Sequence, residues 1–145
     1  MNMLRKVPVR EQEPAVRAAN FEEVCLGYNM EEAMEEATRC IQCKNARCIQ
    51  GCPVAIDIPG FIAKVKEGKI LEAADKIAEA SSLPAVCGRV CPQESQCEGK
   101  CIRGIKGEAV SIGKLERFVA DYAREQGHVP SVSETPNGMK VAVIG

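Results

Sequence analysis

Apolar positions along the chain recur mostly three and four residues apart, the spacing that places them on one face of a helix. The first such stretch follows Asn29, a residue typical of helix N-caps, and runs to about Cys40. Several glutamates come directly after Asn29, where their negative charge favours the positive end of a helix dipole. The pattern predicts a first helix that delivers the chain into a cysteine-containing loop.

Three further helices are predicted downstream of that loop. One follows Asp57 and stops at Gly68, another covers roughly 69–81, and the last begins after Ser111. A second cysteine loop is expected over 87–101, between the last two helices. Before the final six residues, no stretch has the pattern of a strand. The predicted fold class is therefore all-α.

The two ends of the chain differ from this helical middle. Residues 1–20 are charged and carry two prolines, so we expect an arm with little structure of its own. Residues 127–139 are rich in Pro, Ser and Gly and are typical of a linker. Residues 140–145 then form a short buried-strand pattern that ends in Gly145. The expected order is an arm, a helical domain over 21–126, a linker and the first strand of a different domain.

Composition narrows the classes of function. The 145 residues carry a formal net charge of −1 with both signs interspersed, and no basic stripe is present, so nucleic acid is not an expected partner. No apolar run is long enough for a signal peptide or a membrane span, so we expect a cytoplasmic protein with no membrane partner. Aromatic residues make up only 3%, so the core must be built mainly from Ala, Val, Ile and Leu. Such a core is thin for 145 residues, and we expect something else to help stabilise the fold.

Nine cysteines can supply that support. Eight of them fall into two groups, Cys40-x2-Cys43-x4-Cys48-x3-Cys52-Pro53 and Cys87-x3-Cys91-Pro92-x4-Cys97-x3-Cys101. In a reducing compartment such groups indicate metal rather than disulfides. In two-cluster ferredoxins the cysteine before proline ligates the other cluster, so Cys52 is expected to serve a different cluster from Cys40, Cys43 and Cys48. Spacing alone thus predicts two [4Fe–4S] clusters on eight cysteines.

Zinc is the competing metal, because it also accepts four thiolates. Zinc sites usually combine paired C-x2-C knuckles, often with histidine, whereas the second group has no C-x2-C. The one histidine, His128, falls in the predicted linker and is expected to be solvated. Cys25 stands apart from both groups and is expected to pack as a small apolar side chain. The spacing thus favours iron–sulfur clusters, and a zinc-stabilised protein-interaction domain is the alternative from a different class of function.

Glu116 is the one carboxylate on the apolar stripe of the last predicted helix. It lies four residues after Ile112 and three before Val119. Burying a carboxylate is costly unless it is paired or bound to metal. Spacing alone favours a solvated edge position, from which Glu116 could pair with Lys114, Arg117 or Arg124.

Several motifs together resemble a known family. They include Cys40-Ile-Gln-Cys43-Lys44, Gly51-Cys-Pro-Val54, Cys87-Gly-Arg-Val-Cys-Pro-Gln-Glu94 and Ile112-Gly-Lys-Leu-Glu-Arg-Phe118. The chain resembles the N-terminal iron–sulfur domain of glutamate synthase small subunits over about residues 20–145. Related NAD(P)H-dependent flavin oxidoreductases share this domain: the large subunit of NADH-dependent reduced ferredoxin:NADP oxidoreductase, sulfide dehydrogenase and dihydropyrimidine dehydrogenase. The resemblance implies an alpha-helical ferredoxin fold with two [4Fe–4S] clusters.

The resemblance also implies which residues hold the clusters. It assigns one cluster to Cys40, Cys43, Cys48 and Cys101, and the other to Cys52, Cys91, Cys97 and Glu116. The position of Glu116 is glutamine in dihydropyrimidine dehydrogenase, so glutamate here argues against that enzyme. Cys87 matches a cysteine that is not a ligand there. The ligand count implied by the family is therefore seven cysteines and one glutamate, which replaces the eight cysteines expected from spacing.

Family members continue into an FAD-binding turn and an NAD(P)-binding domain, and Gly145 would be the first glycine of that turn. A single glycine cannot hold a dinucleotide, so this chain alone is not expected to oxidise NAD(P)H. The implied function is to relay electrons between FAD, bound by C-terminal domains of the same polypeptide, and a large catalytic partner subunit. A free-standing ferredoxin-like carrier is a further alternative, against which the expected start of another domain argues.

Overall fold

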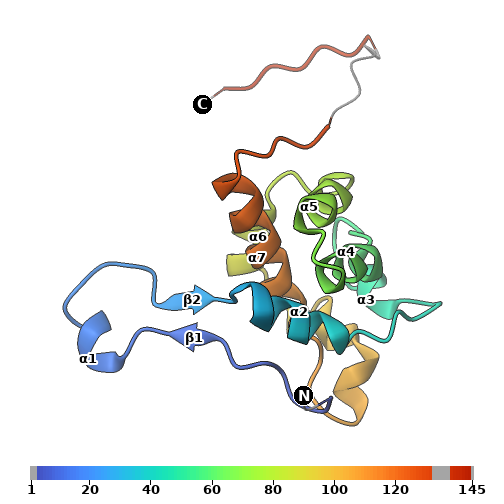
Figure 1. Ribbon diagram of the computed structural model, residues 1–145. Helices are drawn as coiled ribbons and strands as arrows, with labels where there is room; N and C mark the ends of the chain where they lie inside the picture. The colour runs from blue at the N-terminus through green and yellow to red at the C-terminus, as the bar shows by residue number, and fades with distance from the viewer. Residues whose placement is uncertain (1–2, 132–137, 145) are drawn as a thin grey trace.

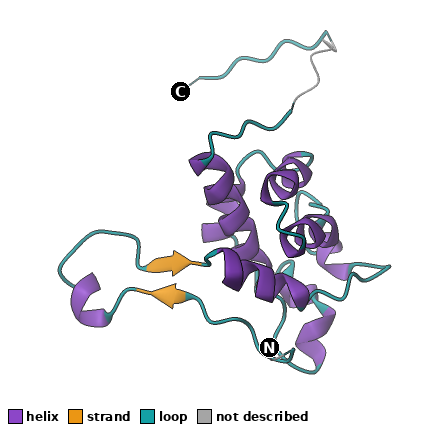
Figure 2. Ribbon diagram, in the orientation of Figure 1, coloured by secondary structure: helices purple, strands orange, loops and turns teal. Residues whose placement is uncertain are grey.

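The computed structural model describes residues 3–131 and 138–144, and it is mostly helical (Figures 1 and 2). The α-helices are α1 (Pro14–Arg17), α2 (Met30–Thr38), α3 (Arg47–Gln50), α4 (Ile58–Lys66), α5 (Ile70–Ala78), α6 (Pro84–Val90) and α7 (Ile112–Glu125). Two 3₁₀ helices, η1 (Glu98–Lys100) and η2 (Ile102–Ile105), and two short strands, β1 (Arg10–Glu11) and β2 (Cys25–Gly27), complete the elements.

Local side-chain caps explain where the predicted helices begin. The Asn29 side chain accepts a 2.9 Å hydrogen bond from the Glu32 amide, and the Glu32 carboxylate accepts one of 2.7 Å from the Asn29 amide. This reciprocal pair satisfies two amides that the first turn leaves free. Asp57 likewise accepts from the Gly60 amide at the start of α4. The predicted starts of both helices are confirmed.

Three helices build most of the apolar core. Phe61 and Val65 of α4, Ile77 of α5 and Leu115 and Val119 of α7 are fully buried. Helix α4 packs against α5, and both contact α7, which runs through the middle of the helical body (Figure 1). The cysteine-bearing segments lie around this core, so the core positions the loops on which the candidate site depends.

Helix α6 corrects the prediction of a cysteine loop over 87–101, because its last four residues, 87–90, are helical. Pro84 occupies the first turn of α6, where its missing amide and fixed φ favour a helix start. The helix packs along α7 at Gly88, where a Cβ atom would lie 2.7 Å from the Arg117 amide nitrogen. Close backbone approach therefore requires glycine at this position, and it brings Cys87 and Cys91 against α7.

The N-terminal arm is more ordered than predicted, and the all-α prediction needs a small correction. Strands β1 and β2 pair antiparallel and form a hairpin that projects from the helical body (Figure 2). The Val7 amide donates to Glu36 at 2.7 Å, and the Tyr28 hydroxyl donates to the Val7 carbonyl at 2.7 Å. Strands of two and three residues are too short to show alternation in the sequence, which is why they were not predicted.

An ion-pair network fastens this hairpin to the helices. Arg89 of α6 contacts Glu23 at 2.8 Å and Asp121 of α7 at 2.7 Å. Arg117 contacts the same two carboxylates. Hydrogen bonding to Arg89 lowers the pKa of Glu23, and the two arginines outweigh burial to lower the pKa of Asp121. The hairpin is therefore held by charge as well as by backbone pairing.

The C-terminal segment adds one correction. The His128 ring lies 2.8 Å from Asp75 of α5 and is half-buried, so it is not the solvated linker residue expected. Residues 138–144 form no strand, and Val141, Val143 and Ile144 are exposed. Gly145 and part of the predicted linker lie outside the described residues. Among the helices that are described, none has the length and apolar character needed to cross a membrane.

Candidate metal centres

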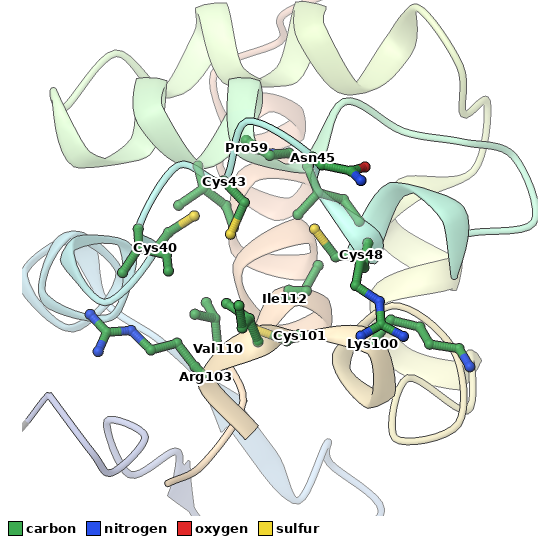
Figure 3. A pocket seen from close by; sticks show the side chains of 15 residues that line it. Cys40, Cys43, Asn45, Cys48, Pro59, Lys100, Cys101, Arg103, Val110 and Ile112 are labelled. Carbon is green, nitrogen blue, oxygen red and sulfur yellow. The ribbon is translucent and has the colours of Figure 1, made fainter. Parts of the chain in front are cut away.

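Four cysteines from four separate places in the fold line one cavity. Cys40 follows α2, Cys43 lies in the next loop, Cys48 lies in α3 and Cys101 separates η1 from η2. They surround a cavity of about 80 Å³, and Figure 3 shows the four side chains around it. Cys101 lies more than fifty residues from Cys48 in sequence, so the fold itself assembles this first thiol group.

Apolar side chains make up much of the wall of this cavity. Ile58 and Ile62 of α4 line it together with Val110 and Ile112, all of which are buried. Burial is the main cause that raises the pKa of Cys48 to about 11, and the neighbouring Cys101 and Cys40 raise it further. Burial also raises the pKa of Cys40. Gathered thiolates in such a place need a compensating positive charge, which bound iron would supply.

Buried Arg39 and partly buried Arg103 tie the two halves of this thiol group together. The Arg103 side chain donates a 2.7 Å hydrogen bond to the carbonyl of Arg39, the residue before Cys40. Arg39 is fully buried, pairs with Glu36 and donates to the carbonyls of Glu108 and Ala109. The segment that carries Cys40 is thereby fixed against the segment that carries Cys101. Sequence reasoning missed both arginines, although each lies within two residues of a candidate ligand.

A second group contains Cys52, Cys91, Cys97 and Glu116. Burial raises the pKa of Cys97 to about 12, with contributions from Glu98, Cys52 and Glu116. Burial likewise raises the pKa of Cys91, to which Cys87, Glu116 and Cys52 add. Cys52 lies near enough to Cys91 and Cys97 to raise the pKa of both, and it does not line the cavity that Cys48 lines. The chain therefore crosses from one group to the other between Cys48 and Cys52.

Glu116 is not the solvated edge residue that spacing alone favours. Its side chain is 7% exposed, and its Oε1 has no hydrogen-bond partner among the described residues. Burial raises its pKa to about 7. The nearby cation Arg117 pairs instead with Glu23 and Asp121. A buried carboxylate oxygen without a partner is costly, and ligation to metal is one of the few ways to satisfy it.

Cys87 and Cys25 differ in their surroundings. Cys87 lies in α6, and its thiol is near enough to Cys91 to raise the pKa of that residue, so the second group contains five possible donors. Cys25 is half-buried in β2 and lines neither group. The position of Cys25 agrees with its predicted packing role. Cys87, by contrast, lies beside the second group, although the family resemblance implies that it is not a ligand.

The spread of the donors bears on the kind of metal. Across residues 3–131 and 138–144, no three Cys, His, Asp or Glu side chains converge tightly enough to hold a single ion. The first group instead encloses a cavity, as a polynuclear cluster requires. The donor set of soft thiolates also suits iron–sulfur chemistry. The cavity and its thiol donors therefore fit an iron–sulfur cluster.

Comparison with known proteins gives the same chemistry. Residues 17–128 match the family described as dihydropyrimidine dehydrogenase domain II, 4Fe-4S cluster. The chain is 46% identical over 131 residues to the protein UacF of Escherichia coli K12, covering 89% of this chain and 20% of that protein. It is 43% identical over 137 residues to the glutamate synthase [NADPH] small chain of Halomonas elongata, covering 93% and 29%.

A third relative is the NAD-dependent dihydropyrimidine dehydrogenase subunit PreT of Escherichia coli K12. The identity is 39% over 113 residues, which cover 78% of this chain and 27% of PreT. The chain thus spans less than a third of each of these three relatives. It belongs to the dihydropyrimidine dehydrogenase domain II family and is an iron–sulfur electron-transfer domain of the kind found in glutamate synthase small-chain-like oxidoreductases.

Proposed function

We propose that the domain holds two [4Fe–4S] clusters with crossed ligation. The first cluster would be bound by Cys40, Cys43, Cys48 and Cys101. The second would be bound by Cys52, Cys91, Cys97 and Glu116. The observation that carries this proposal is the gathering of donors from distant segments into two groups, with a buried unpaired carboxylate oxygen in the second.

When bound, clusters of this type accept and release electrons one at a time. The chain's own residues set the surroundings in which that happens. Several isoleucines and Val110 line the first group, and Arg103 places a positive charge beside Cys40. The second group has the carboxylates of Glu116 and Glu98 nearby, and both raise the pKa of Cys97. Charge and burial are established means of setting cluster potentials, so the two sites should differ.

Within a longer polypeptide, the domain would pass electrons between an FAD site and a partner. The relatives are three to five times as long, which leaves room for FAD- and NAD(P)-binding domains after residue 145. The name of the Halomonas elongata relative, a glutamate synthase small chain, suggests a large catalytic subunit as the partner. We place this activity in the cytoplasm, where thiols stay reduced.

Two other functions compete with this proposal. A zinc-stabilised interaction domain would need a compact four-ligand site, which the described residues do not provide. A free-standing ferredoxin-like carrier would use the same clusters without further domains, and the length of the relatives favours the multidomain alternative. Colour and metal content separate zinc from iron directly.

Anaerobic iron and acid-labile sulfide analysis, combined with EPR of dithionite-reduced protein, tests the proposal. We expect about eight iron and about eight sulfide atoms per chain and two distinguishable reduced-cluster signals. Stoichiometric zinc without sulfide would favour the interaction domain. Iron and sulfide at about half the expected content would leave one cluster and remove the crossed arrangement.

A further inference from the structure

The rim of the first thiol group is strongly cationic. Arg47, Lys100 and Arg103 line the cavity itself, and Lys100 and Arg103 flank it on opposite sides in Figure 3. Lys44 and Lys106 extend the same two segments and are exposed. We call these five side chains the cationic rim. Residues 41–53 and 99–107, which supply them, contain no Asp or Glu, although the whole chain has 20 acidic residues against 19 basic ones.

The charges of the cationic rim are not neutralised within the domain. Among the described residues, none of the five forms an ion pair. The acids closest in sequence are already engaged, because Glu98 pairs with Lys6 and the Glu108 carboxylate accepts from the Lys6 amide. Arg103 uses its Nε to donate to a backbone carbonyl and keeps its charge. The positive potential of the rim is therefore available to a partner.

Apolar side chains lie among these charges. Ile41, Ile102 and Ile105 are 51%, 47% and 71% exposed, and the first two line the cavity beside the thiols. Exposed apolar residues surrounded by charge are the usual composition of a protein docking surface. The position matters as well, because a protein bound here would sit directly over the first thiol group.

The second group lacks this combination. The arginines nearest to it in the fold, Arg89 and Arg117, are both committed to Glu23 and Asp121. Its exposed neighbours Val86 and Val90 are apolar. Within the described part of the chain, several exposed cations without ion pairs therefore gather beside the first group.

We propose that the cationic rim docks an acidic redox protein, or the acidic face of a redox subunit, so that electrons leave or enter the domain through the first group. This inference rests on the proposed function, because it requires a cluster in that group. Complementary charge would raise the rate of encounter and orient the partner's redox centre toward the thiols. Salt should weaken the effect, because screening shortens the reach of the rim to about 10 Å at 0.1 M ionic strength.

Electron transfer to two haem proteins of opposite charge tests the docking surface. The cluster-loaded chain, reduced anaerobically, is mixed in a stopped-flow instrument with ferric cytochrome b5, which is acidic, or ferric cytochrome c, which is basic. One electron passes from the reduced chain to the ferric haem in each case. The test variant is Lys44→Glu with Lys106→Glu, because neither side chain lines the cavity. The matched control is Lys66→Glu with Lys140→Glu, two exposed lysines without ion pairs, which change the net charge equally.

We expect the test variant to reduce cytochrome b5 roughly tenfold more slowly at low salt, to reduce cytochrome c faster, and to lose both differences at high salt. The control variant should change either rate by less than about twofold. Equal effects in the two variants, with iron content and EPR unchanged, would overturn the docking surface and leave the proposed function standing. Failure of the unmodified chain to hold clusters would instead overturn the proposed function.

Discussion

Glu116 is the residue on which the second metal site depends most. It is buried, its Oε1 lacks a hydrogen-bond partner among the described residues, and its pKa is raised to about 7 by burial. A ligand with a hard oxygen donor should give its cluster a potential and an EPR signature unlike those of an all-thiolate cluster. The neighbouring Cys87 offers an alternative fourth donor, so the two residues can be tested against each other.

Glu116→Ala should alter the EPR signal or midpoint potential of one cluster and leave the other unchanged, because only the second group contains this carboxylate. Cys87→Ala is the matched control and should leave both signals in place. Potentiometric EPR on the two variants measures this directly. If Cys87→Ala changes the signal and Glu116→Ala does not, Cys87 is the fourth ligand and Glu116 leaves the ligand set.

At the scale of elements, the contact between α6 and α7 brings Cys91, the residue directly after α6, near Glu116 of α7. The contact is close because Gly88 has no side chain, and a Cβ atom there would lie 2.7 Å from the Arg117 amide nitrogen and 2.8 Å from its Cα. These are backbone atoms within a helix, so they cannot move aside cheaply. The spacing of the two helices, and with it the second metal site, therefore depends on this glycine.

Gly88→Ala should lower the free energy of unfolding by about 1–3 kcal/mol, because overpacking at this contact outweighs the gain of about 1 kcal/mol that alanine brings to a helix. Anaerobic urea denaturation followed by circular dichroism gives the value. Gly104→Ala is the control, since its Cβ atom would meet its nearest neighbour at 3.8 Å. Equal stabilities for the two variants would contradict the packing argument.

The position of the β1–β2 hairpin depends on the ion pairs that Arg89 forms with Glu23 and Asp121. Arg89→Met should speed hydrogen exchange in β1 and β2, because it removes contacts to Glu23 and Asp121 and leaves Glu23 with Arg117 as its one ion-pair partner among the described residues. Arg124→Met is the control, because Arg124 is exposed and contacts Asp121 only at 3.5 Å. Unchanged exchange in Arg89→Met would show that backbone pairing alone anchors the hairpin.

The pH dependence of this network follows from its carboxyls. The folded pKa values of Glu23 and Asp121 are lowered from 4.5 and 3.8. The stabilisation is therefore fully present above the unfolded values and is lost as the pH falls through the lower folded ones. Across the neutral range, hydrogen-exchange protection of the hairpin should not vary with pH once the intrinsic rate is corrected.

At the scale of the whole molecule, sequence predicted the elements that have local causes. The starts of α2 and α4 follow from Asn29 and Asp57, whose side chains cap them. The sequence pattern predicts a cysteine loop where α6 lies, although proline in a first turn, as Pro84 is here, favours a helix start. The local pattern indicates where a helix lies, but proline is found both at helix starts and after helix ends, so it does not by itself say which end it marks.

Only part of the candidate site could be predicted from the sequence, because tertiary contacts decide which distant residues meet. Cysteine spacing predicted two metal groups, but their exact membership depends on which distant segments the fold brings together. Burial of Glu116 could not be derived from spacing, which favoured an exposed edge, and only the family resemblance pointed to its role. The hydrogen bond from Arg103 to Arg39 is likewise a tertiary contact between residues 64 positions apart. Such contacts are properties of the packed molecule.

Removing the metal should loosen the cysteine loops before the core. Phe61, Ile77 and Leu115 are buried among α4, α5 and α7, whereas residues 40–55 and 91–105 have few buried apolar side chains. After anaerobic chelation, hydrogen exchange should rise strongly in those two segments and less in α4, α5 and α7. Exchange that stays unchanged throughout would show that the fold does not rely on its clusters.

We propose that Cys48 and Cys52, four residues apart, bind different clusters. Paired cysteine variants test this ligation most directly. EPR of reduced Cys52→Ala and Cys101→Ala proteins, each compared with Cys48→Ala, decides which thiols share a cluster. We predict that Cys101→Ala and Cys48→Ala lose the same signal and that Cys52→Ala loses the other one. Loss of one and the same signal in Cys48→Ala and Cys52→Ala, with Cys101→Ala losing the other, would contradict the account.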